Sequence, residues 1–339
     1  MNTGADPFST ENAVLVPEVG AEPGRPLAPN SRFLWKKGLT PCLSVGNLAM
    51  GGRGKTPVVG YLARLLLDAG ERPAILSRGY GRRRPEDGVV IVSDGRHITA
   101  DLDRSGDEPL MLARAVPGAA VLVCDVRAVA RAVAERAIGA TVTVLDDGFQ
   151  HRAVPRDADI VIVTPDDLRD RRVPFGKLRE SVSALRRAHA VIVDGDPKDA
   201  DLRPFTGPVF ALRRSLGVPV PIEPDRGWTP GSNGTVVAVA GIARPERFAQ
   251  ALGASGRAVA RLVAFRDHHR YRRRDLDTIA TAVRETGASM VLTTEKDAIR
   301  LRPLRPLPVP MAAVPLEVTV EPAAEFRAWV LARLREART

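Results

Sequence analysis

The apolar and polar positions of this chain follow the pattern of an α/β protein. Short apolar runs, many of them rich in β-branched residues, predict strands at 42–45, 74–77, 89–92, 120–124, 141–145, 160–164 and 190–194. Continuous rather than alternating runs are typical of strands that helices cover on both faces. Helices are predicted between these strands at 58–69, 107–115, 127–138 and 179–188. The pattern favours a doubly wound, mostly parallel sheet, in which ligands gather at the carboxyl ends of the strands.

A second, smaller α/β segment follows a passage rich in proline and glycine at 204–234, which we interpret as a connection. The segment has predicted strands at 235–240, 259–263 and 289–293, and predicted helices at 245–252, 275–286 and 323–337. The first part of the chain contains five prolines and little periodicity, so it is predicted to be disordered or loosely attached. The expected division of the chain is therefore 1–38, 39–205 and 206–339.

The amino-acid composition restricts the possible classes of protein but does not identify a reaction. The 339 residues are 44% hydrophobic and carry a formal net charge of +10, mostly from arginine. Such a surplus of positive charge reflects either the coding composition or an anionic partner, which could be a nucleotide, a phosphorylated substrate, an acidic membrane surface or nucleic acid. No stretch approaches the roughly 18 apolar residues that span a bilayer. Both cysteines lie in apolar runs, which predicts buried free thiols rather than a disulfide or a metal site.

The clearest chemical signal lies at 44–57, between the first predicted strand and helix. The N–H groups at a helix N-terminus and the helix dipole attract anions, Lys55 adds an ammonium for phosphates, and Thr56 adds a hydroxyl for Mg²⁺. The strict pattern G-x-x-x-x-G-K-[ST] requires glycine where this chain has alanine. The stretch nevertheless predicts a phosphate loop, with the nucleotide-binding residues Ala49, Met50, Gly51, Gly52, Arg53, Gly54, Lys55 and Thr56.

Carboxylates occur at two further positions where this chemistry needs them. Asp146 and Asp147 end the strand predicted at 141–145, the usual place for the acidic group that holds Mg²⁺ beside a phosphate loop. Which of the two contacts the metal stays open, since one of them fits equally well as a cap of the next turn. Asp107 opens a predicted helix, where it acts as a helix cap, as a general base or as a group that orients a substrate hydroxyl.

The second segment contains the sequence Asp267-His268-His269. An aspartate beside a histidine can hold the imidazole for proton transfer. A zinc site is disfavoured because neither cysteine is near in sequence and the usual ligand spacings are missing. Thr294, at the end of another predicted strand, is interpreted either as a helix cap or as part of a contact from 293–297 to nucleotide or substrate.

Taken together, these motifs resemble the tetraacyldisaccharide 4′-kinase family, which phosphorylates the lipid A precursor. The matching stretches occur in the family's order, at 44–57, 77–81, 106–109, 146–152, 176–180, 241–248, 267–271 and 293–301. The loop of this family does not need a glycine at the position of Ala49. Related partitioning and metallochaperone ATPases carry a lysine before the Gly-Gly pair, where this chain has Met50.

The resemblance implies a P-loop NTPase-like fold and transfer of the ATP γ-phosphate to the 4′-hydroxyl of a tetraacylated glucosamine disaccharide 1-phosphate. It implies that Lys55 and the loop amides hold the phosphates. It assigns Mg²⁺ to Thr56, Asp146 and Asp147, with Glu180 as a further polar group near the metal. The cofactors expected from it are ATP and Mg²⁺.

The resemblance also implies that Asp107, paired with His268, is the base that acts on the sugar hydroxyl, with His269 as the alternative. The smaller domain would contribute this histidine to the active site by closing over the larger one. Positions on the substrate side of the site would be Arg78, Arg127, Gln150 and His151.

Members of this family commonly begin with an apolar helix inserted in the membrane, and residues 1–38 contain no such helix. We therefore expect peripheral attachment to the cytoplasmic face of the inner membrane, through arginine patches and the stretch 33–37. No nucleic acid and no obligate protein partner are predicted. One alternative is a GTPase switch or metal-insertion factor, but its guanine-binding motif N-K-x-D is missing. The other alternative is a basic nucleic-acid-binding ATPase, but this chain contains no motif for nucleic-acid recognition.

Overall fold

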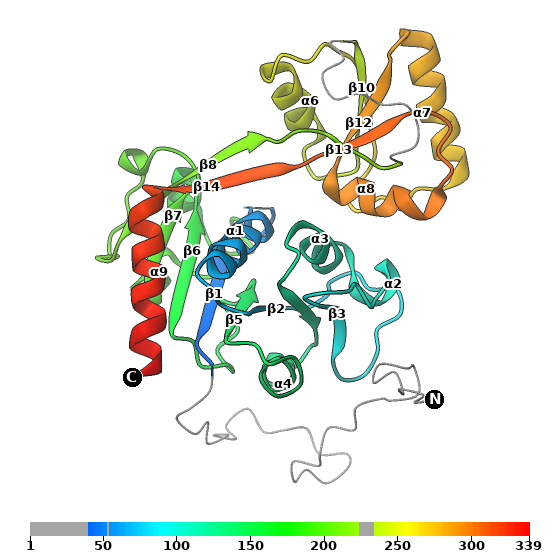
Figure 1. Cartoon of the computed structure of the whole chain (residues 1–339). Helices are drawn as coiled ribbons and strands as arrows, with labels where there is room; N and C mark the ends of the chain where they lie inside the picture. The colour runs from blue at the N-terminus through cyan, green and yellow to red at the C-terminus, as the bar shows by residue number, and fades with distance from the viewer. Residues whose placement is uncertain (1–39, 53, 224–233) are drawn as a thin grey trace, which may run out of the picture. The chain divides into compact units, whose positions relative to one another are not determined.

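The computed structural model describes residues 40–52, 54–223 and 234–339. Thr40–Thr339 forms one compact unit, and its described residues contain two β-sheets (Figure 1). The predicted segment 1–38, with the stretch 33–37 inside it, and Arg53 of the phosphate loop lie outside the described residues.

The larger sheet has nine strands within the described part of the chain and is mostly parallel. Its strands in spatial order are β14 (Leu316–Glu321), β8 (Val209–Leu216), β7 (Ala190–Val193), β6 (Ala158–Val163), β1 (Cys42–Asn47), β5 (Val142–Asp146), β2 (Pro73–Ser77), β4 (Ala120–Val123) and β3 (Val90–Asp94). The pairings β8–β14 and β3–β4 are antiparallel. The predicted α/β fold with a mostly parallel sheet is confirmed.

The central strands are apolar throughout because helices cover both faces of the sheet. Every residue of β1, β6 and β7 is buried. On one face, α1 (Lys55–Asp68), α3 (Asp107–Ala115) and α9 (Ala323–Arg338) share one apolar cluster with the sheet. On the other face, α4 (Arg127–Val133) packs in a separate cluster with alternate residues of the same strands. This two-sided burial explains why the runs do not alternate.

The smaller sheet has five strands among the described residues. In spatial order they are β11 (Val259–Ala264), β10 (Val236–Ala240), β12 (Met290–Thr294), β13 (Met311–Val314) and β9 (Val220–Pro221). Figure 1 shows α6 (Pro245–Ala254) apart from α7 (Arg273–Thr286) and α8 (Glu295–Leu301) around this sheet. The apolar contacts agree, because α6 packs in one cluster while α7 and α8 share another.

The remaining elements are short. They are α2 (Leu102–Ser105), α5 (Pro165–Arg169), a π-helical turn (Ala134–Ile138) that continues α4, and 3₁₀ turns at Val182–Arg187, Pro197–Asp199 and Arg302–Leu304. The α-helix predicted at 179–188 is therefore wrong, since only a 3₁₀ turn forms there. The segment is a 3₁₀ turn that begins after Ser181 and ends before Ala188.

The two sheets do not divide the chain at residue 205, where the sequence predicts a domain boundary. β8, β14 and α9 all follow that residue, yet they belong to the larger sheet and its helical layer. β8 lies inside the passage 204–234 that was expected to be a connection. Its burial pattern, three buried residues followed by exposed arginines, resembles neither an alternating nor a fully apolar strand. The Phe326 ring of α9 packs edge-on against Phe210 of β8, with centroids 5.0 Å apart.

Candidate active site

The loop between β1 and α1 is held at its start by a second loop. Ala49 is fully buried and forms an antiparallel bridge with Leu178. Next to it, the N–H of Met50 donates to the carbonyl of Lys177 at 2.7 Å. A residue in such an extended bridge does not need the left-handed conformation that glycine provides. The departure from the strict phosphate-loop pattern therefore has a structural cause.

The end of the same loop does need glycine. Gly51 and Gly54 have φ angles of 98° and 77°, in the region that favours glycine. Gly54 directly precedes α1, whose first N–H groups have no partner inside the helix. Lys55 and Thr56 occupy the first turn of α1, and Met50, Gly51 and Gly52 are exposed. The loop thus has an open helix N-terminus of the kind that binds phosphate.

Lys55 reaches back across this loop. Its ammonium donates to the Oδ1 of Asn47, at the end of β1, at 3.0 Å. It also forms an ion pair with Asp147 at 3.5 Å, and the Asp147 carboxylate accepts a charged hydrogen bond from Arg179 at 2.9 Å. Asp147 has a φ of 55°, an uncommon conformation for a residue other than glycine. The Lys55 ammonium is therefore held between the ends of the neighbouring strands β1 and β5.

Asp146 lies at the end of β5, which pairs with β1 in the sheet. The side chain is buried, and Ser77 donates a long hydrogen bond of 3.4 Å to it. Burial, together with the nearby charges of Glu108 and Asp147, raises the pKa of Asp146 to about 7, although Lys55 opposes this. The carboxylates are thus crowded at the edge of the sheet where the phosphate loop begins.

The residues at this edge fit a metal ion that is shared with phosphate groups. Among the described residues, no group of three or more His, Cys, Asp or Glu side chains is arranged to hold a metal by itself. Mg²⁺ in phosphoryl-transfer enzymes usually takes one or two carboxylates and fills its other positions with phosphate and water oxygens. A divalent cation would offset both the burial of Asp146 and its repulsion from Asp147.

Glu180, the fourth residue expected near the metal, turns toward arginines. Its carboxylate accepts hydrogen bonds from Arg187 at 2.9 Å and 3.0 Å and from Arg152 at 3.2 Å. Its neighbour Arg179, instead, reaches the carboxylate of Asp147. The structure therefore does not gather Glu180 with the two aspartates, and its metal role stays a prediction.

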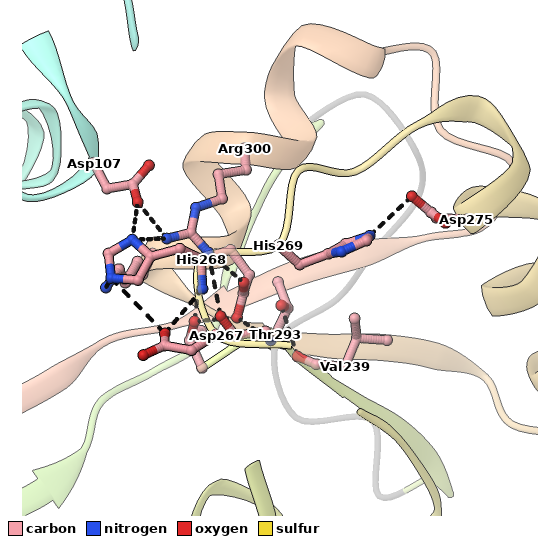
Figure 2. A network of polar contacts seen from close by, with 12 residues as sticks. Asp107, Val239, Asp267, His268, His269, Asp275, Thr293 and Arg300 are labelled. Carbon is pink, nitrogen blue, oxygen red and sulfur yellow. Dashed lines mark hydrogen bonds and ion pairs between the residues drawn. The ribbon is translucent and has the colours of Figure 1, made fainter. Parts of the chain in front are cut away.

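A second charged cluster forms where α3 meets α8. Asp107 Oδ2 accepts a hydrogen bond from Arg300 and lies 3.0 Å from Nδ1 of His268 (Figure 2). Lys296 lies 3.0 Å from the other ring nitrogen of His268 and 3.2 Å from Glu108. Two successive carboxylates of α3 thus face two cations four residues apart on α8. Three of these four groups, Asp107, Lys296 and Arg300, also contact the histidine.

Donors lie at both ring nitrogens of His268. Lys296 has only donors and lies 3.0 Å from Nε2, which favours a ring that carries its proton on Nδ1 and donates it to Asp107, whereas the Arg300 guanidinium, 3.2 Å from the same Nδ1, opposes that tautomer. Burial alone would raise the pKa of Asp107, but His268, Arg300 and Lys296 outweigh it and hold that pKa well below its usual range. The cluster therefore keeps Asp107 as a carboxylate with a fixed orientation.

His269 points elsewhere. Its Nε2 lies 3.0 Å from Asp275, and its ring stacks on Phe265 with centroids 4.6 Å apart. Figure 2 shows the two adjacent imidazoles directed to different carboxylates. Of the two histidines that the sequence left open, His268 is the one that contacts Asp107.

The structure also shows which of two residues with a predicted cap role is a helix cap. The N-cap of α3 is Gly106, without a side-chain hydrogen bond, so Asp107 does not cap the helix. Thr294 does cap α8, because its hydroxyl accepts from the N–H of Asp297 at 3.1 Å.

The predicted substrate-side residues surround the carboxyl ends of β2, β4 and β5. Gln150 donates to the carbonyl of Asn47 at 2.9 Å. Arg127 is buried at the start of α4 and donates to the carbonyl of Cys124 at 2.6 Å. Burial and then the charge of Arg78, which follows β2, lower the pKa of Arg127. Burial and the charges of these arginines likewise lower the pKa of His151. Arg78, Arg127 and His151 therefore share one electropositive region.

The fold and the loop define a class of protein, the P-loop phosphotransferases with a mostly parallel α/β sheet. Comparison with known proteins narrows this to one family. The family described as tetraacyldisaccharide-1-P 4′-kinase matches residues 32–335. The chain belongs to this family, and it is accordingly an enzyme, a phosphotransferase with an alcohol acceptor. The resemblance drawn from its motifs is confirmed, and the GTPase and nucleic-acid alternatives fall away.

Individual relatives agree over most of the chain. The tetraacyldisaccharide 4′-kinase of Syntrophus aciditrophicus is 38% identical, with 90% of this chain and 87% of the relative covered. That of Nitrobacter winogradskyi is 40% identical, with 87% and 85% covered. A crystal structure titled as the apo form of LpxK from Aquifex aeolicus in complex with ATP superposes with a TM-score of 0.71 at 30% identity. It covers 87% of this chain and 89% of that protein. Within the described residues, no helix has the length and apolar content to cross a membrane.

Proposed function

We propose that this kinase transfers the γ-phosphate of ATP to the 4′-hydroxyl of a tetraacylated glucosamine disaccharide 1-phosphate, the lipid A precursor. Family membership supports the reaction, and the contact between Asp107 and His268 supports their assignment to the acceptor. The observation that carries the proposal is the contact between α3 and α8, since it assembles a base from two distant parts of the chain.

In this proposal the phosphate loop binds the nucleotide. The open N-terminus of α1 receives the phosphates, and Lys55 exchanges its contacts with Asn47 and Asp147 for phosphate oxygens. Thr56, Asp146 and Asp147 are the residues suited to hold Mg²⁺. When bound, this ion neutralises charge on the transferred group. Arg179, which sequence reasoning did not single out, would keep Asp147 oriented.

The α3–α8 cluster serves the acceptor. The sugar oxygen attacks the γ-phosphorus while the bond to the ADP oxygen breaks, and the hydroxyl proton passes to the Asp107 carboxylate. Phosphoryl transfer has a loose transition state, so little negative charge must develop on the attacking oxygen, and a weakly basic but well-placed carboxylate suffices. His268 and Arg300 hold that carboxylate, and Lys296 holds His268. The electropositive region of Arg78, Arg127 and His151 suits the acceptor's anionic side.

The acceptor is a lipid, so the enzyme must meet it at a membrane surface. We propose peripheral binding to the inner face of the inner membrane, favoured by the net charge of +10. No obligate protein partner and no nucleic acid enter this mechanism.

The test is an assay of purified protein with labelled ATP, Mg²⁺ and either the lipid A disaccharide 1-phosphate or free glucosamine as acceptor. The proposal expects label on the 4′-oxygen of the disaccharide and none on glucosamine. Equal labelling of both acceptors, or ATP hydrolysis without transfer, would contradict it.

A further inference from the structure

The loop beside the phosphate loop presents apolar side chains to solvent. Phe175 is 84% exposed and Val173 is 49% exposed, and they lie two residues apart in the 170–178 turn. Isolated exposed apolar residues are common, but a fully presented phenylalanine beside a second apolar residue needs an explanation. Neither residue has a role in the reaction described above.

The turn is rigidly built by its own backbone. Leu178 both donates to Arg171 and accepts from Val173, each at 3.0 Å, and the N–H of Phe175 donates to Arg172 at 3.0 Å. A side chain at Gly176 would collide with the carbonyl of Arg171, since a Cβ would lie 2.2 Å from it. The exposed side chains are therefore held outward by a closed turn.

Cations surround these apolar residues. Arg171, Arg172 and Lys177 are all exposed. The one carboxylate of the turn, Asp170, is occupied by the backbone N–H groups of Arg171 and Lys177, at 2.7 Å and 3.2 Å. A cavity of about 460 Å³ opens beneath the turn and is lined by apolar as well as basic residues, including Val173, Phe175, Leu178 and Val182.

An aromatic and aliphatic tip ringed by arginine and lysine is the composition of a membrane-interface anchor. Aromatic rings settle at the level of the lipid headgroups, and long cationic side chains lay their stems on apolar surface while the charges meet anionic lipid. An acidic protein surface would satisfy the cations but would leave the phenylalanine without an apolar partner. Charge and apolar exposure together therefore favour a bilayer.

We propose that the 170–178 turn is the anchor by which this kinase docks on an anionic bilayer surface. The inference rests on the membrane location proposed above and names the surface that achieves it. Because the turn is bonded to the phosphate loop through Met50 and Ala49, docking places the nucleotide site next to the headgroups. The acceptor's sugar would then meet the site without leaving the membrane.

The experiment is co-sedimentation of the full chain with vesicles of phosphatidylethanolamine and phosphatidylglycerol. Removing two interfacial apolar side chains by Val173→Ser and Phe175→Ser should lower the partition coefficient roughly 10-fold or more. Arg171→Gln with Arg172→Gln should lower it by about the same factor at low salt and by less at high salt. The matched controls are Val218→Ser, at another exposed valine, and Arg327→Gln with Arg335→Gln on α9.

Unchanged vesicle binding in both sets of turn variants, or an equal loss in the controls, would overturn the proposal. So would equal binding of the wild type to neutral phosphatidylcholine vesicles. An assay with detergent-dispersed acceptor distinguishes a loss of membrane docking from a loss of catalysis. The turn variants should keep their activity in this assay within about twofold of wild type while they lose vesicle binding. A wild type that binds vesicles but transfers no phosphate would refute the proposed reaction and leave the anchor standing.

Discussion

The phosphate loop and the α3–α8 cluster are built in opposite ways. The loop lies within one strand, one turn and one helix, and the aspartates beside it come from β5, the next strand in the sheet. In the cluster, Asp107 lies 161 positions from His268 and 193 positions from Arg300. The first is shaped by backbone conformation, and the second by side-chain charges that meet only in the folded protein.

The phosphate loop and the α3–α8 cluster should therefore respond differently to substitutions. Backbone N–H groups cannot be removed by substitution, so the loop depends on a few side chains and glycines. The cluster consists of mutually dependent ionisable groups, so loss of one partner leaves another buried and unpaired. We therefore expect the loop to respond to substitution at single points and the cluster to respond as a unit.

The largest effect is expected at Lys55. Lys55→Ala removes the ammonium that neutralises the phosphates, so both ATP affinity and turnover should fall, with turnover reduced by roughly two or more orders of magnitude. Steady-state kinetics with the lipid acceptor measure this, and Lys198→Ala, at an exposed lysine, is the control. Turnover within tenfold of wild type would remove Lys55 from the mechanism.

The next effect separates the cluster from the loop. Arg300→Gln leaves Asp107 with a weaker partner, so kcat should fall by about 10-fold to 100-fold while ATP affinity changes little, and Arg300→Lys should recover part of the loss. Because the pKa of Asp107 is lowered in the folded protein, its ionised carboxylate stabilises the fold at pH values above the ordinary carboxyl pKa. This stabilisation is lost as the pH falls through the lowered pKa. Without Arg300 the pKa rises, so acid inactivation should begin at higher pH. A pH–rate profile identical to wild type would contradict this role.

A smaller effect concerns stability at the metal edge. Because the pKa of Asp146 is raised to about 7, the folded state holds a proton that the unfolded state has released, and stability falls as the pH rises from about 4 to 7. Asp146→Asn should therefore stabilise the nucleotide-free protein at pH 8, by on the order of 2 kcal/mol. Denaturant unfolding of the wild type and the variant at pH 8 measures the difference in the free energy of unfolding. A variant that is less stable than wild type at pH 8 would show that the ionised carboxylate of Asp146 does not destabilise the folded protein.

The smallest effect is expected at Ala49. Ala49→Gly restores the strict phosphate-loop pattern, but the backbone is already extended and bridged to Leu178, so nothing is gained. The flexibility of glycine should cost about 1 kcal/mol or less of stability, with turnover within about twofold of wild type. Thermal unfolding and kinetics check this, and a tenfold gain in turnover would mean that the alanine limits nucleotide binding.

The sequence was a good guide where structure follows from local pattern. The apolar runs located most of the parallel strands, though not β8 or β13, and the glycines with Lys55 located the phosphate loop. β8 and β14 were missed as members of the larger sheet. The mixed burial of β8 matches neither strand pattern, whereas β14 alternates between buried and exposed residues and could have been found from that alternation. Because these strands and α9 follow residue 205, the two sheets do not divide the chain there.

The α3–α8 cluster could be predicted only in part. Asp107 and His268 were paired through the family resemblance, without any signal in the residues that they meet. Lys296 and Arg300 went unnoticed as partners, because in a sequence with so many arginines a buried one cannot be told from a solvated one. Only tertiary packing distinguishes them.

The most direct test of this two-region centre is single-turnover transfer by Asp107→Asn at saturating ATP and Mg²⁺. The substitution keeps the shape of the side chain and the phosphate loop intact but removes the base. We predict ATP affinity within about twofold of wild type and a transfer rate to the lipid acceptor at least 100-fold lower, the range for loss of a general base. Transfer at close to the wild-type rate would contradict the claim that the α3–α8 cluster and the phosphate loop act in one reaction.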